Sequence, residues 1–197
     1  MEVVISLALT TALLLGSPGP APLALAGVGA SFGFREGTGF LVGILAGLLM
    51  VIVLVGAGLG TLFTTYPTAK LICQGIAAVY LCYVAYKIAT AKGGVACQTA
   101  EAPSFKDGFI LNLINPKAYA AFLAIFANNM LSDYSSQMNA LLTGAICFVV
   151  AVVVDGLWMA TGAKLRPFFA KPEQATKLRI GFAIALLISV FVSLLQV

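Results

Sequence analysis

The sequence predicts an all-α membrane protein with six transmembrane helices, arranged as two inverted repeats of three helices. Three observations lead to this class. Of the 197 residues, 61% are hydrophobic and 9% are charged, six uncharged runs are long enough to cross a bilayer, and the basic residues gather in alternate loops. A water-soluble domain of this size could not bury so large an apolar fraction. We therefore expect residues 1–197 to form a single transmembrane domain.

A helix crosses about 30 Å of hydrocarbon with about 20 apolar residues, at about 1.5 Å per residue. Runs of this kind lie near residues 2–28, 38–63, 68–90, 108–131, 137–163 and 177–197. Residues 93–103 are rich in small and polar side chains and form a predicted cytoplasmic linker. The chain thus divides into a first repeat of about residues 1–92 and a second of about residues 104–197.

The distribution of basic residues predicts the orientation of the chain. Nine of the eleven lysines and arginines fall on one side of a six-span chain: Arg35, Lys87, Lys92, Lys106, Lys164, Arg166, Lys171, Lys177 and Arg179. The positive-inside rule places their loops in the cytoplasm and both termini on the extracytoplasmic side of the membrane. This pattern explains the net charge of +4 without a nucleic-acid partner.

Proline clusters interrupt the first and fourth runs, at Ser17-Pro18-Gly19-Pro20 and at Asn115-Pro116-Lys117. The two breaks hold equivalent places in the two halves. Because each half has three crossings, the halves must enter the membrane from opposite sides, which gives an inverted repeat. Proline removes a backbone donor, and the freed groups are tolerated in lipid only where protein, water or a solute cavity supplies partners. Paired breaks of this kind are typical of a transporter's binding site.

Lys117 and Asp155 are the two charged residues that fall deep inside predicted spans, at similar depth. Each charge alone would cost at least about 2.5 kcal/mol near the bilayer centre, so we expect the two to lie on facing helices. Asn112 and Asn115 add polar groups close to Pro116. An embedded ionisable residue is by default a functional candidate. The alternatives are a structural Lys117–Asp155 bridge and a Lys117 side chain that extends to the interface.

The segment Ser17–Pro20 is expected to unwind about one turn and to begin a new half-helix. The positive end of that half-helix dipole would attract a carboxylate, and the freed carbonyls would accept from an ammonium group. This combination suits an amino acid. A static kink is the alternative, because proline is common in membrane helices.

Gly39, Gly43 and Gly47 recur every four residues in the second run. Such a stripe lets another helix backbone approach closely, so it predicts a packing surface. It would permit a homodimer without requiring one.

No metal or cofactor is expected. Cys73, Cys82, Cys97 and Cys147 show no CxxC spacing, and the chain contains no histidine. A membrane thiol-disulfide electron carrier would need two of these cysteines to meet inside the bilayer. A metal-ion exporter would need several carboxylates or histidines. A membrane scaffold without transport activity is the remaining alternative.

In order and spacing, several motifs together resemble the lysine exporter (LysE/RhtB) superfamily of bacterial amino-acid efflux carriers. They are Pro18-Gly19-Pro20, Phe34-Arg35-Glu36-Gly37, Gly75, Tyr80-Leu81, Phe105 to Gly108, Asn112 and Asn115-Pro116-Lys117. The chain departs from the family pattern at Ala21, where Asn or Asp is common. The resemblance covers nearly the whole chain. It implies a secondary transporter, not an enzyme, in the bacterial inner membrane, exporting an amino acid or related small metabolite with a proton as coupling ion.

Combined with this resemblance, the residues predict a role for each polar group. Lys117 would attract the carboxylate of a zwitterionic cargo. Asn112, Asn115 and the Ser17–Pro20 backbone would fix its orientation. Asp155 would exchange a proton, or would pair with Lys117 in the empty carrier.

Overall fold

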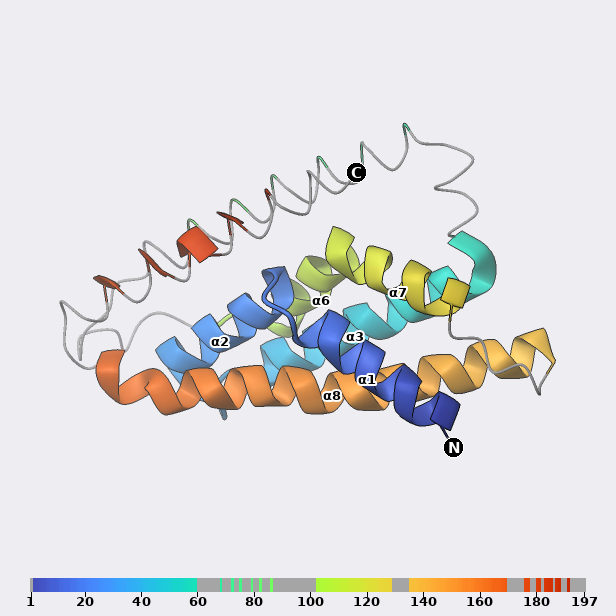
Figure 1. Cartoon of the computed structure of the whole chain (residues 1–197). Helices are drawn as coiled ribbons and strands as arrows, with labels where there is room; N and C mark the ends of the chain where they lie inside the picture. The colour runs from blue at the N-terminus through green and yellow to red at the C-terminus, as the bar shows by residue number, and fades with distance from the viewer. Residues whose placement is uncertain are drawn as a thin grey trace.

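The computed structural model describes residues 2–59, 102–128 and 135–169, together with scattered positions in 68–86 and 176–191. All of its elements are helical (Figure 1). They are α1 (Glu2–Gly16), α2 (Pro20–Phe32), α3 (Thr38–Leu54), the π-helical turn η1 (Val55–Leu59), α6 (Phe105–Leu113), α7 (Pro116–Asn128) and α8 (Ser136–Phe169). No strand occurs among the described residues, which agrees with the predicted all-α class.

Two continuous helical stretches, Thr38–Gly58 and Gln137–Leu165, are long and apolar enough to cross a membrane. Two bent pairs pass the same test when each pair is taken as one span. They are α1 with α2, bent by 65°, and α6 with α7, bent by 56°. These four units correspond to the first, second, fourth and fifth predicted runs. Most residues of the runs at 68–90 and 177–197, and of the linker at 93–103, lie outside the described residues.

Both bends fall at the proline motifs. The first helix ends at Gly16 and resumes at Pro20, after an extended Gly19 with φ −173° and ψ −177°. The second ends at Leu113 and resumes at Pro116. Proline is well tolerated at the first position of a helix, because the N–H that it lacks has no partner there. The prolines therefore begin new helices at both breaks.

Close glycine contacts join α2 to α8, the helix against which both α1 and α2 lie (Figure 1). A Cβ atom at Gly162 would lie 2.0 Å from the carbonyl oxygen of Ala26, and one at Gly29 would lie 2.2 Å from that of Met159. No side chain fits at such distances. Small residues of this kind allow helix backbones to approach one another in membranes.

The glycine stripe packs α3 against α6 within the chain. A Cβ atom at Gly43 would lie 2.1 Å from the carbonyl oxygen of Phe105, and one at Gly47 would lie 2.6 Å from that of Phe109. Gly39 has more room, since its Cβ would be 3.9 Å from the nearest atom. Two of the three stripe positions are thus in contact with a helix of the same protein.

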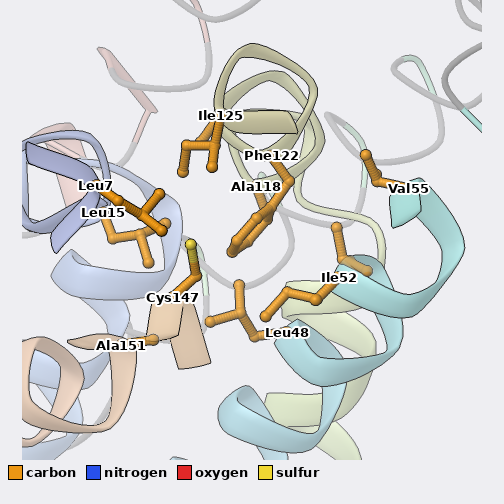
Figure 2. Close-up of a cluster of buried hydrophobic side chains, with 12 residues drawn as sticks. Leu7, Leu15, Leu48, Ile52, Val55, Ala118, Phe122, Ile125, Cys147 and Ala151 are labelled. Carbon is orange, nitrogen blue, oxygen red and sulfur yellow. The ribbon is translucent and has the colours of Figure 1, made fainter. Parts of the chain in front are cut away.

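Two apolar clusters lie on either side of the breaks. The first joins α1, α3, η1, α7 and α8, and Figure 2 shows its side chains converging from these elements. Its members include the fully buried Leu7, Phe122 and Ile125. The second cluster joins α2, α3, α6 and α8 around Leu25 and Ile44. Each broken helix contributes one half to each cluster, so the breaks lie at the boundary between the two cores.

Candidate functional site

Lys117 connects the two breaks. Its Nζ, at the start of α7, donates to the carbonyl oxygen of Ser17 and, at 3.4 Å, to that of Pro18. The side chain also lies against Gly19, where a Cβ atom would be 2.7 Å from Lys117 Cδ. The structure therefore brings the residues of the two proline motifs together. Ser17 and Pro18 are exposed, Lys117 is half-buried, and Gly19 is buried.

The carbonyl groups at the first break lack their usual donors. In an α-helix the N–H of each residue bonds the carbonyl four residues earlier. Pro18, Pro20 and Pro22 have no N–H, so the carbonyls of Leu14, Gly16 and Pro18 lose that partner.

Each of these three carbonyls receives a side-chain donor instead. Ser17 Oγ donates to Leu14 O at 2.9 Å, Trp158 Nε1 donates to Gly16 O at 3.2 Å, and Lys117 Nζ donates to Pro18 O. Buried backbone polar groups are almost always paired, and here two of the three donors come from other helices. The first break is therefore completed by α7 and α8.

The start of α2 offers few donors to an anion. Its first and third residues are Pro20 and Pro22, and Gly19, which precedes them, makes no side-chain cap. Within that first turn Ala21 supplies the one remaining N–H, and its side chain is buried. The predicted attraction of a carboxylate to this half-helix thus relies on few hydrogen bonds. Lys117 is the stronger anion-binding group nearby.

The second break is completed by its own side chains. Asn115 Nδ2 donates to Asn112 Oδ1 at 3.2 Å, and Asn115 Oδ1 accepts from the backbone N–H of Lys117 at 3.1 Å. Asn112 Nδ2 in turn donates to the carbonyl of Ile44 on α3 at 2.9 Å. Both asparagines are buried. They cap α7 and attach the break to α3.

Asp155 lies on α8 and is 5% exposed. Its carboxylate interacts electrostatically with the Lys117 ammonium group. No direct ion pair joins the two among the described residues, because Lys117 donates to the carbonyls of the first break instead. The expected pairing of Lys117 with Asp155 is therefore an attraction at longer range in this structure.

Sequence analysis overlooked Trp158 and a buried polar stripe along α8. Trp158 is the single tryptophan and follows Asp155 by three residues, so the two lie on the same face of α8. Asn139, Thr143 and Cys147 follow one another at intervals of four residues, Asp155 comes eight residues after Cys147, and all four side chains are buried. The regular spacing of polar residues along the fifth run could have indicated this buried stripe.

Polar contacts link the members of the α8 stripe. Thr143 Oγ1 donates to Asn139 Oδ1 at 3.3 Å, and Cys147 Sγ lies 3.3 Å from Thr11 Oγ1 on α1. No group of three metal-ligating side chains occurs within the described part of the chain. Cys82 and Cys147 are free thiols, while Cys73 and Cys97 lie outside the described residues.

An apolar helical bundle with two broken helices, whose freed backbone groups meet embedded charges, defines a membrane transport protein. The chain belongs to the LysE family of LysE type translocators, which matches residues 12–196. It is accordingly an efflux transporter and not an enzyme, and it is a multi-pass protein of the bacterial inner membrane. The resemblance inferred from the proline motifs is confirmed.

Similar proteins span nearly the same length. The homoserine/homoserine lactone efflux protein of Salmonella typhimurium is 29% identical over 179 residues, which cover 88% of this chain and 87% of that protein. The protein of the same name from Salmonella typhi is 28% identical over the same shares. An uncharacterized membrane protein of Vibrio cholerae is 24% identical and covers 86% of this chain and 85% of its own length. No solved structure matches the chain.

Proposed function

We propose that this protein exports an amino acid or a closely related small metabolite across the inner membrane, coupled to protons. The observation that carries the proposal is the contact between Lys117 of the second break and the carbonyls of the first. It brings a cation and carbonyl acceptors that lack backbone donors into one place, which suits a zwitterionic cargo. Lys117 would attract the carboxylate, and the Ser17–Pro20 backbone would accept from the ammonium.

The names of the Salmonella relatives support this class of cargo. Homoserine and its lactone both carry a primary amino group, whereas only homoserine carries a free carboxylate. A carrier for both must recognise the amino group, and carbonyl oxygens are suitable acceptors for it. Asn112 and Asn115, which lie beside Lys117 in sequence, would fix the orientation of the cargo.

The proposed architecture is a six-span inverted repeat with both termini on the extracytoplasmic side of the membrane. The two bent pairs at equivalent places in the halves support it. Access would alternate around the breaks, with lipid surrounding the bundle. Because α6 covers Gly43 and Gly47, the glycine stripe is not free to form a homodimer.

Asp155 is the proposed proton carrier. It is the one carboxylate buried among the described residues, and it lies on the polar stripe that also holds Cys147 and Thr143. Replacing Asp155 with Asn keeps the shape and removes the titratable group. We expect Asp155→Asn to abolish the dependence of export on the pH gradient. Export at the normal rate and with normal pH dependence would remove Asp155 from the coupling mechanism.

The proposed function is tested with purified protein in vesicles and a panel of radiolabelled amino acids, including homoserine. We expect at least one compound to be transported by the wild-type protein and lost in Lys117→Ala. Lys106→Ala is the matched control, because Lys106 is an exposed lysine on α6. If the wild-type protein moves no amino compound, the proposal is wrong. Loss of transport in both lysine variants would show that the effect is not specific to the site.

A further inference from the structure

We propose that the carbonyls of Ser17 and Pro18 form an ammonium subsite, that Lys117 occupies this subsite in the empty carrier, and that the ammonium group of the cargo displaces it. This inference rests on the proposed function and adds the group by which cargo is recognised. It makes a primary ammonium the required feature of the cargo and a carboxylate a secondary one.

The two carbonyls are acceptors that local backbone donors leave open. Pro18 O would normally accept from residue 22, which is a proline. Ser17 O would normally accept from Ala21, but the extended backbone at Gly19 separates them, and Lys117 is the donor that this carbonyl receives.

The neighbouring carbonyls, by contrast, have donors of their own. Gly16 O accepts from Trp158 Nε1 at 3.2 Å, and Gly19 O accepts from the N–H of Leu23 at 3.0 Å. The break therefore leaves two adjacent acceptors for one external donor. An ammonium group, with three N–H donors, can bond to both.

Lys117 fills this subsite with the same chemical group that a cargo amine would bring. Gly19 provides the space, since a Cβ atom there would lie 2.7 Å from Lys117 Cδ and 2.9 Å from Nζ. The lysine stem is flexible, and Ser17 and Pro18 are exposed, so the ammonium can leave without a helix moving.

The displaced Lys117 has two places to go. It is attracted by the buried Asp155 carboxylate, and it can also meet the carboxylate of a zwitterionic cargo. Because one ammonium replaces another, the two carbonyls stay paired during the exchange. This avoids the cost of unpaired backbone groups inside the membrane.

The test uses ethylammonium as the probe and thermal unfolding of the purified protein as the measurement. Lys117→Met keeps a long flexible side chain but empties the subsite. Binding to the folded state raises the unfolding midpoint, so Lys117→Met should respond at a concentration about tenfold lower than wild type requires. Tetramethylammonium, which has no N–H, should have no effect on either protein. Lys106→Met should respond as wild type does.

Equal responses of wild type and Lys117→Met would overturn the inference, as would stabilisation of Lys117→Met by both ions. If Lys117→Met does not fold, Lys117→Leu also leaves the two carbonyls without a side-chain donor and carries the same expectation. The experiment measures binding and not transport, so it tests the ammonium subsite separately from the proposed export function. Amino-acid export by wild type without ethylammonium binding to the variant rejects only the subsite. Selective ethylammonium binding without export of any amino compound rejects only the proposed function.

Discussion

The two breaks obtain hydrogen-bond partners for their freed polar groups in opposite ways. At the second break, Asn112 and Asn115 bond each other and the α7 backbone, so the polar groups are satisfied mainly from within the motif. At the first, the Gly16 carbonyl receives its donor from Trp158 on α8, and the carbonyls of Ser17 and Pro18 receive theirs from Lys117 on α7. One break is self-contained and the other depends on its neighbours.

This difference follows from the residues at each break. The first contains three prolines within five residues and no amide side chain, so it loses donors and has only Ser17 Oγ to replace them. The second has one proline, preceded by Asn112 and Asn115, whose side-chain amides both donate and accept. The first break is therefore a source of acceptors, and the second is a rigid mount for the lysine that reaches them. Substitutions at the two breaks should therefore differ in their effects on stability and on export.

Separating the first break from α8 should have the largest effect. Gly162→Ala places a Cβ atom 2.0 Å from the carbonyl oxygen of Ala26, so α2 must shift away from α8. Overpacking of this kind costs about 1–3 kcal/mol or more, and we expect a loss of about 3 kcal/mol in the free energy of unfolding in detergent. Gly156→Ala is the control on the same helix, because no atom lies within 4 Å of its Cβ. Equal stability of the two variants would contradict the close α2–α8 contact.

Opening the self-contained break should have the next largest effect. Asn115→Ala removes the bond to Asn112 and the acceptor for the Lys117 N–H. A lost helix cap costs about 1 kcal/mol and a lost hydrogen bond between side chains in a membrane protein about 0.6 kcal/mol, so we expect about 1.6 kcal/mol in total. Chemical denaturation in detergent measures the change.

Asn115→Ser separates the two contributions. Serine keeps an acceptor suited to the first turn of α7 but cannot reach Asn112 as a donor in the same way. Its cost should be about half that of Asn115→Ala. If both variants were as stable as wild type, the second break would not depend on its own side chains.

The positions of the breaks could be predicted from the sequence, but their partners could not. Proline placement determines where backbone donors are missing, and this depends on local sequence alone. Which side chain donates to Gly16 O depends on how α8 packs against α1. The local sequence does not determine this packing. Trp158 was therefore overlooked.

The embedded charges show the same limit. Equal depth suggested a direct pair between Lys117 and Asp155, but depth says nothing about the competing carbonyls. Two peptide oxygens close to Lys117 Nζ take its hydrogen bonds, and Asp155 contributes only at longer range.

Removing one external donor from the first break should have a smaller effect. Trp158→Phe keeps an aromatic ring but deletes the N–H that bonds Gly16 O. Interhelical hydrogen bonds in membrane proteins contribute about 0.6 kcal/mol on average, so we expect a loss of about that size. A double variant with Asn115→Ala checks independence, since the two costs should add if the breaks are stabilised separately. Strong coupling between them would contradict the contrast between the breaks.

The smallest change in stability should come from Gly19→Ala, and yet this variant should impair export. Gly19 is extended, with φ −173°, so alanine fits its backbone without strain. The new Cβ would collide only with the flexible end of Lys117, which can move aside. The unfolding free energy should therefore change by less than about 0.5 kcal/mol. The carbonyl pair, however, would lose the space that an ammonium group requires.

Gly16→Ala is the matched control at the other end of the break, since its Cβ would lie 3.7 Å from Val154 Cγ1, an ordinary contact. Transport in vesicles should fall in Gly19→Ala and stay near normal in Gly16→Ala. Normal transport in both variants would mean that cargo does not pass between Gly19 and Lys117.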